Sequence, residues 1–199
     1  MGILKRIIDS FIYRIRKRKT IDRIINGGGK LGKRVSLVVL KDGNFICGKN
    51  VMILSSGIEY AEGCRIAVLP GATLRIGDNT GMSQVSITCK DSITIGSHCT
   101  IGAGVMMFDT NFHNTDWRVR RTPEDLKTAK TAPITIGDDC FIGTRSIICK
   151  GVCIGNRTII AAGSVVVSDI PSDCIAGGNP CKVIKQMNNN EDNRSNRNI

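Results

Sequence analysis

The chain has 199 residues, of which only 4% are aromatic and 41% are hydrophobic. This length supports one compact core, whereas so few aromatic side chains fit poorly with the core of an ordinary β-sandwich or helical bundle. The formal net charge of +11 is uneven, because basic residues crowd the beginning of the chain, and it therefore indicates an anionic partner rather than a particular fold.

Residues 1–25 are expected to form a basic amphipathic helix. Apolar side chains recur there at steps of three and four: Leu4, Ile7, Ile8, Phe11, Ile12 and Ile15. Charged residues interrupt the run too often for a bilayer span or a signal peptide. Two interpretations stay open: contact with an anionic membrane surface, or packing on the domain or on a neighbouring subunit. No recognition motif or stacking aromatics accompany the basic residues, so nucleic acid is not an expected partner.

Three glycines, Gly27 to Gly29, predict a break after this helix, so residues 1–33 read as a helical segment with a Gly-rich linker. The following residues, 34–187, form the predicted main domain. Its register is loose up to residue 75, as expected of a terminal coil.

A period of six residues organises this domain. The clearest sixes each open on an aliphatic residue: Ile136, Ile142, Ile148, Ile154, Ile160 and Val166. Their fifth places hold small or moderate side chains: Cys140, Ser146, Val152, Thr158, Ser164 and Ile170. A helix would need spacings of three and four, and a solvated strand a spacing of two. The pattern therefore predicts an all-β fold, a parallel β-helix of stacked hexapeptide coils.

The sixes stop between residues 107 and 133, in a segment that holds the only Trp and one of two histidines, His113. An excursion from a repetitive rod is where function is expected. The other histidine, His98, falls at an outward corner and is expected to face solvent. Residues 188–199 form a polar tail that is expected to be disordered.

The nine cysteines are predicted to be reduced and structural. Their number is odd, and no CxxC pair or Cys/His zinc spacing is present, so no metal is expected. Cys99 and Cys140 occupy small inward places of their sixes, where a thiol serves as a compact apolar group. Reduced cysteines indicate a cytoplasmic location. If residues 1–25 bind a membrane, the protein is expected on the inner membrane surface.

Several runs together carry a resemblance to a known family: SITIGSHCTIGAGVMMFDTNFHNTD, PITIGDDCFIG, AAGSVVVSDIP and AGGNPCKVI. The chain resembles the hexapeptide-repeat acyltransferases, and within them the maltose and galactoside O-acetyltransferase branch that includes enzymes of surface-polysaccharide synthesis. The similarity covers residues 34–187. It implies a left-handed β-helix, a homotrimer, and acetyl-CoA bound in a cleft between two subunits.

Acetyl transfer to a hydroxyl needs a base for the hydroxyl proton, and a largely neutral imidazole can serve. His113 matches the catalytic histidine of the family in its D-x-x-F-H segment. Asp109 is expected to orient its ring, with Asp116 as a second candidate. The resemblance further implies acceptor contacts from Ser83, Gln84 and Asn111.

The resemblance also implies a binding groove for the acyl donor on the later coils. The expected groove residues are Gly143, Thr144, Ala161, Ala162 and Gly163, with Lys182 and Lys185 at the phosphates of CoA. Small residues in such a groove let an extended ligand approach backbone amides.

The predicted function is therefore acetyl-CoA-dependent O-acetylation of a sugar hydroxyl by direct transfer, in capsule, O-antigen or exopolysaccharide biosynthesis. Two alternatives remain: an N-acetyltransferase acting on a nucleotide-linked amino sugar, and a non-catalytic β-helix scaffold. A γ-type carbonic anhydrase is excluded because it needs three histidine ligands and the chain has two histidines.

Overall fold

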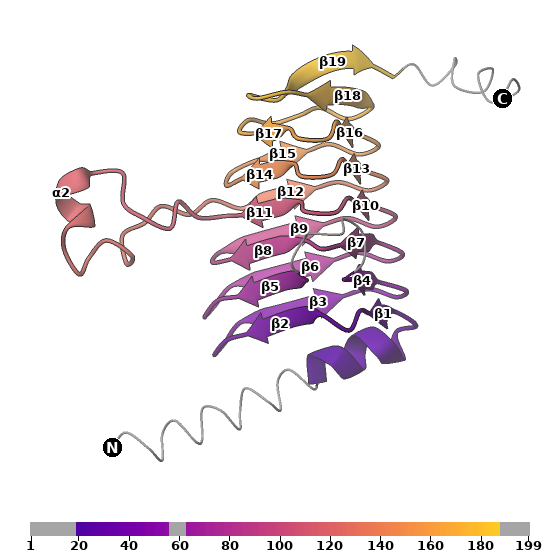
Figure 1. Cartoon of the computed structure of the whole chain (residues 1–199), viewed down its shortest axis with the longest axis horizontal. Helices are drawn as coiled ribbons and strands as arrows, with labels where there is room; N and C mark the ends of the chain where they lie inside the picture. Colours follow the sequence, from indigo (N-terminus) through magenta and orange to yellow (C-terminus); the bar gives the residue numbers. More distant parts are fainter. Residues whose placement is uncertain (1–18, 56–62, 188–199) are drawn as a thin grey trace, which may run out of the picture.

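The computed structural model describes residues 19–55 and 63–187, and its strands stack into a three-sided prism (Figure 1). The chain visits three sheets in a fixed rotation, and neighbouring coils pair in parallel. Among the paired strands of the described residues, only β18 and β19 are antiparallel. The predicted left-handed parallel β-helix is confirmed.

Each side of the prism is one sheet. The long sheet contains β1 (Lys30–Leu31), β4 (Met52–Leu54), β7 (Gly81–Ser83), β10 (Thr100–Ile101), β13 (Phe141–Ile142), β16 (Ile159–Ile160), β18 (Cys174–Gly177) and β19 (Lys182–Gln186). The six-stranded sheet contains β2 (Val35–Val39), β5 (Cys64–Val68), β8 (Ser86–Cys89), β11 (Met106–Phe108), β14 (Ile147–Cys149) and β17 (Val165–Val166). The five-stranded sheet contains β3 (Asn44–Cys47), β6 (Thr73–Ile76), β9 (Ser92–Ile95), β12 (Ile134–Ile136) and β15 (Cys153–Ile154).

Three corners join these sheets, and we number them in chain order. The first corner leads from the long sheet to the six-stranded sheet, the second from there to the five-stranded sheet, and the third back to the long sheet. Residues at the same corner of successive coils lie above one another, because the strands on either side are in register. A ligand that extends along a corner would therefore meet the same position of several coils.

The core is a set of aliphatic ladders inside the prism. On the long sheet, Met82, Ile101, Ile142 and Ile160 are paired in register and at most 2% exposed. The opening residues of the sixes and their fifth places are all buried, as the period predicted. A single coil cannot bury its apolar side chains alone. The stacking of neighbouring coils buries them and so stabilises the prism.

At the third corner, buried hydroxyl and thiol groups replace apolar side chains. Thr80 Oγ1 donates to the carbonyl of Gly96 at 2.7 Å, and Cys99 Sγ donates to the carbonyl of Gly137 at 3.1 Å. Each bond reaches the adjacent coil. All nine cysteines lie in the described part of the chain and are free thiols. Burial raises the pKa of the Cys64 thiol to about 11, so that thiol stays protonated at neutral pH.

A helix over residues 19–26 covers the first coil, and Ile24 on it is 1% exposed. The predicted helix of residues 1–25 lies mostly outside the described residues, as does the tail of residues 188–199. The expected boundary at residue 34 is wrong, because β1 already pairs with β4 through Lys30 and Leu31. Gly29, directly before this strand, lies close to Ile24 and Val51: an added Cβ would be within about 3 Å of their backbone oxygens, so this glycine is needed for close packing.

No helix in the described ranges is long and apolar enough to cross a membrane. The helix over residues 19–26 instead contributes to the core through Ile24.

Candidate active site

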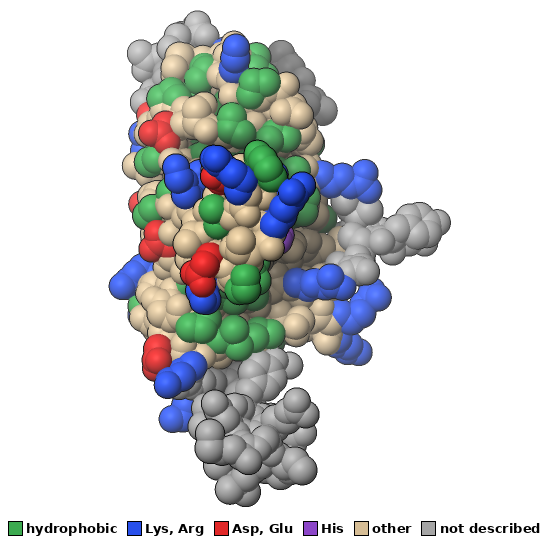
Figure 2. All heavy atoms as spheres, turned by 90° about the vertical axis from the view of Figure 1, so that its left-hand side faces the viewer, with side chains coloured by type: hydrophobic (Ala, Val, Ile, Leu, Met, Phe, Trp, Pro, Cys, Tyr) green, Lys and Arg blue, Asp and Glu red, His purple; other side chains and the backbone are tan. Residues whose placement is uncertain are grey.

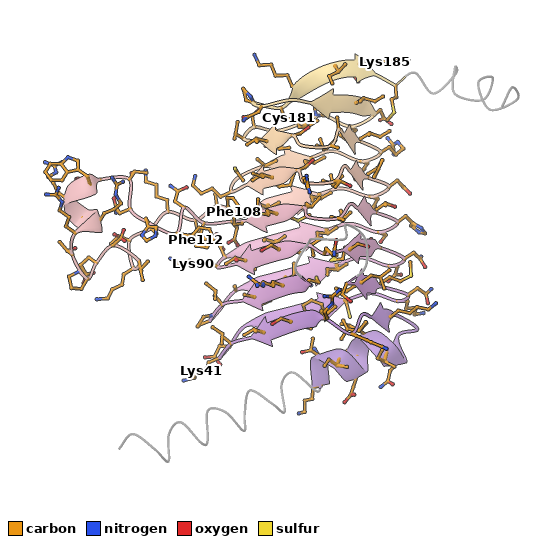
Figure 3. The ribbon with its side chains drawn as sticks, viewed as in Figure 1. Lys41, Lys90, Phe108, Phe112, Cys181 and Lys185 are labelled. Carbon is orange, nitrogen blue, oxygen red and sulfur yellow. The ribbon has the colours of Figure 1, made fainter. Side chains whose placement is uncertain are left out.

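The excursion leaves the prism at the second corner, directly after β11 (Figure 1). Its two arms run side by side: Thr110 and Thr131 form an antiparallel bridge, and the Asn111 amide donates to the carbonyl of Lys130 at 3.0 Å. Near the root, the rings of Phe108 and Phe112 are 5.6 Å apart (Figure 3). The outer part holds the short helix α2 (Trp117–Arg120). The Lys90 side chain, on the coil below, also donates to the carbonyl of Leu126 at 2.8 Å, so contacts within the loop and one with the prism hold it in place.

His113 lies on this loop with one ring nitrogen held and the other open. Its Nδ1 is 2.6 Å from Asp125 Oδ2, while its side chain is 61% exposed. The hydrogen bonds from His113 and from the Asn114 amide lower the pKa of Asp125, so this carboxyl is ionised at neutral pH. An ionised carboxylate only accepts, so in the neutral ring Nδ1 carries the proton and Nε2 presents a lone pair. This is the arrangement of a general base.

The predicted contact between Asp109 and His113 is wrong. Asp109 is fully buried, and its two oxygens accept the backbone amides of Lys90 at 2.7 Å and Asp91 at 2.8 Å. That carboxylate ties the root of the loop to the coil below and has no reach to the ring. The second candidate, Asp116, accepts from the Arg118 amide and side chain at the start of α2.

Asp125 was missed at the sequence level because it lies 12 residues from His113, on the returning arm of the loop. It accepts from the Asn114 amide at 2.7 Å as well, which fixes the carboxylate in place. From α2, Arg120 donates to the carbonyls of Asn114 and Thr115, so the short helix braces the segment that follows the histidine. A carboxylate late in the same excursion was the available signal.

The expected donor-groove residues come together at the first corner. Gly143 and Thr144 follow β13, and Ala161 to Gly163 follow β16 one coil further. The Gly163 amide donates to the carbonyl of Thr144 at 2.8 Å, and an added Cβ at Gly143 would lie 2.4 Å from the Ala162 nitrogen. Ala162 and Gly163 are exposed. The five residues therefore form a narrow column of small side chains at the surface, which we call the groove column.

The expected phosphate-binding lysines lie at the end of the same column. Lys182 and Lys185 are exposed on β19, which ends the long sheet next to β18 (Figure 3). The side chain of Ile184 reaches back over Gly177, towards Ala161. Charge therefore stands beyond the last small residues of the column.

The expected acceptor residues do not form one cluster. Ser83 and Gln84 lie at the first corner, two coils before Gly143, whereas Asn111 is on the excursion. Gln84 is only 6% exposed, so its expected acceptor contact does not agree with its burial. His98 is exposed at the third corner, as predicted.

One sheet separates the histidine from the groove within a chain. The groove column stands at the first corner and the excursion leaves from the second, so the whole width of the six-stranded sheet lies between them. The loop also points away from the prism (Figure 1). Within the described residues there is no cluster of His, Cys, Asp or Glu that would hold a metal ion.

Comparison with known proteins agrees with this architecture. The family model described as hexapeptide repeat of succinyl-transferase matches residues 133–168. The galactoside O-acetyltransferase of Escherichia coli K12 is 34% identical over 123 residues, which are 61% of this chain and 58% of that protein. A hexapeptide-repeat acetyltransferase from Vibrio cholerae, solved with acetyl-CoA, has a TM-score of 0.53 and 29% identity, covering 80% of this chain and 72% of that one.

The chain is similar to the hexapeptide-repeat acyltransferases.

Another similar protein is matched over a larger share of its length. The protein provisionally named lipopolysaccharide biosynthesis O-acetyl transferase WbbJ, also from Escherichia coli K12, is 28% identical over 78% of each chain. By contrast, the chain spans about three fifths of the galactoside O-acetyltransferase and of a second relative, from Saccharomyces cerevisiae.

Proposed function

We propose that the protein is an acetyl-CoA-dependent O-acetyltransferase that acetylates a sugar hydroxyl. The observation that carries the proposal is the His113–Asp125 pair, whose Nε2 is left with an open lone pair on an exposed loop. The groove column at the first corner supplies the second requirement, a row of small residues that ends at Lys182 and Lys185. The donor-bound relative from Vibrio cholerae supports acetyl-CoA as the donor.

The proposed reaction is a direct transfer. Nε2 of His113 takes the proton of the acceptor hydroxyl while that oxygen attacks the thioester carbonyl carbon. The carbon–sulfur bond then breaks, and the imidazolium returns the proton to the departing CoA sulfur. Asp125 keeps the ring in the required tautomer and stabilises its positive charge during the step. No nucleophilic side chain is needed on the enzyme.

We place each site between two copies of the chain in a homotrimer. Outward apolar residues flank the first corner on the later coils: Phe141, Ile159 and Ile175 in register on the long sheet, and Met106, Ile147 and Val165 on the six-stranded sheet. The five-stranded sheet instead shows polar outward residues such as Arg75, Thr94 and Thr135. An apolar strip on either side of a groove is typical of an interface, and it would bring the loop of one copy to the groove of the next.

Surface-polysaccharide synthesis is the proposed setting, with a sugar acceptor of a capsule, O-antigen or exopolysaccharide. The named role of WbbJ in lipopolysaccharide biosynthesis supports it. The protein would work in the cytoplasm, with its basic first residues against the anionic inner membrane surface. Sedimentation with anionic vesicles tests that contact. The truncation should stop at residue 18, because Ile24 belongs to the core, and undiminished binding of the truncated protein would contradict it.

The His113→Ala variant tests the proposed chemistry. Acetyl transfer, followed by mass spectrometry over panels of sugars and amino sugars, should fall by roughly 10²- to 10⁴-fold, the usual contribution of a general base. Calorimetry should show unchanged CoA binding, since the substitution leaves the small residues of the groove and both lysines intact. Normal turnover would mean that another base acts. The absence of CoA binding in the unmodified protein would favour a scaffold, and acetylation of amino sugars alone would favour the N-acetyltransferase alternative.

A further inference from the structure

The first corner carries one charged residue where its neighbours are glycine. The backbone turns through positive φ at this corner in successive coils, at Gln84 (48°), Gly104 (74°), Arg145 (59°) and Gly163 (72°). Glycine adopts that conformation without cost, whereas a residue with a Cβ pays on the order of 1 kcal/mol. An exposed arginine therefore stands, at some cost, inside the column of small residues.

Arg157 shows what a structural arginine looks like in the same conformation. It has φ of 55° at the third corner, and its guanidinium is bidentate to Asp173, at 2.6 and 2.7 Å. Arg145 has no such partner: none of the described residues places a carboxylate within ion-pairing distance of it, and its stem lies against Gly104, with Cγ 3.3 Å from where a Cβ would stand. Within residues 19–55 and 63–187, no side-chain partner accounts for the guanidinium.

The position of Arg145 separates it from the lysines of the donor groove. It follows Thr144, and its stem lies over Gly104 on the preceding coil, while Lys182 and Lys185 lie beyond the following coils. The guanidinium therefore belongs to the end of the groove away from the expected phosphates of CoA, on the side of the Ser83 coil.

The excursion carries a matching surplus of positive charge. Apart from the buried Asp109, each carboxylate of the excursion already has a basic partner: Asp116 pairs with Arg118, Glu124 with Lys127, and Asp125 with His113. Two guanidinium groups are left over within the described part of the loop: Arg120 donates only to carbonyls, and Arg121 stacks on the exposed Trp117 ring at 4.5 Å. Figure 2, which views the side of the molecule on which the loop stands, shows Lys and Arg side chains gathered across the middle of that face.

We propose that Arg145 reads a negative charge on the acceptor, so that the acceptor is an anionic saccharide. The inference rests on the proposed function, because only an acetyltransferase has an acceptor. A guanidinium binds a planar carboxylate or a phosphate through two parallel hydrogen bonds. A uronic acid residue of a glycan and the phosphate of a linked sugar present the same chemistry, and the experiment separates the two.

The Arg145→Gly variant is a clean test, because glycine suits the corner. Its melting temperature should stay the same or rise, so that lost binding cannot be ascribed to misfolding. A matched control is Arg75→Gln, which removes an outward arginine from the polar five-stranded sheet.

Saccharide binding is measured by NMR titration on the full-length protein with three probes: a glucuronic-acid oligosaccharide, glucose 1-phosphate and a neutral glucose oligosaccharide. At least one anionic probe should bind more tightly than the neutral one. Arg145→Gly should weaken that binding by roughly 10- to 100-fold, the range for a hydrogen-bonded charge, while Arg75→Gln leaves it unchanged. Whichever anionic probe responds identifies the source of the charge.

Three outcomes would overturn the inference: equal binding of neutral and anionic probes, anionic binding that is indifferent to Arg145, or a loss of CoA affinity in Arg145→Gly, which would make it a donor contact. Arg145-dependent binding of an anionic probe without any acetyl transfer would refute the proposed function and leave the inference in place. Acetylation of neutral sugars alone would refute the inference and leave the proposed function in place.

Discussion

At the residue scale, the site depends on how one imidazole is held. The sequence was sufficient to single out His113, because the hexapeptide period fails around it and the family motif falls there. It was not sufficient to find the partner of the ring. Asp109 is nearer in sequence, but its position directly after β11 turns it towards the amides of Lys90 and Asp91, while the return of the loop brings Asp125 into contact. Only the folded path of the excursion decides between the two carboxylates.

The Asp125→Asn variant should therefore impair catalysis while Asp116→Asn does not. The amide introduced at this position can donate to Nδ1 and so hold the ring in the wrong tautomer, with the proton on Nε2. It also cannot stabilise the imidazolium, so kcat should fall by about 10²-fold, within the range of a general-base contribution. The acceptor KM should change little. Steady-state kinetics of both variants provide the check, and an unimpaired Asp125→Asn enzyme would rule out the orienting role.

The lowered pKa of Asp125 also fixes the direction of a pH effect. A depressed folded-state pKa gives a stabilising contribution that is present above the ordinary carboxyl pKa and is lost as pH falls through the folded-state value. The His113–Asp125 contact should thus survive mild acid, and its loss belongs below the usual titration range of an aspartate.

At the element scale, the period of six was enough to predict the coils because every sixth side chain meets the same constraint inside the prism. It failed where that constraint relaxes. The first coil is covered by the helix over residues 19–26, and β1 is only two residues long, so its pairing with β4 leaves no periodic trace. Contacts across corners were equally hidden, such as the approach of Gly143 to the coil above.

That approach gives a stability prediction with a matched control. Gly143→Ala would place a Cβ 2.4 Å from the Ala162 nitrogen, whereas Gly81→Ala, at an outward position of β7, meets nothing closer than Met52 Cε at 3.6 Å. Gly143→Ala should cost about 1–3 kcal/mol, typical of overpacking, and Gly81→Ala should be nearly neutral. Urea unfolding of the two variants decides it, and equal midpoints would mean that the coils can separate freely.

At the scale of the whole molecule, a single prism carries the two halves of the proposed site, and these halves do not meet. The groove column and the His113 loop stand at different corners, and the six-stranded sheet lies between them. The sequence indicated both halves but not their separation, since corner assignment follows from counting every coil up to the excursion. The account therefore predicts that each site draws its histidine from one copy and its groove from another.

Complementation between two inactive variants measures this most directly. His113→Ala keeps the groove, and Ala162→Trp fills the exposed groove while keeping the loop. Each variant alone should be nearly inactive. When the two are co-expressed and assemble at random, one interface in roughly four joins an intact loop to an intact groove, so about a quarter of the normal activity should return. Activity that stays at the sum of the separate variants would contradict a shared site.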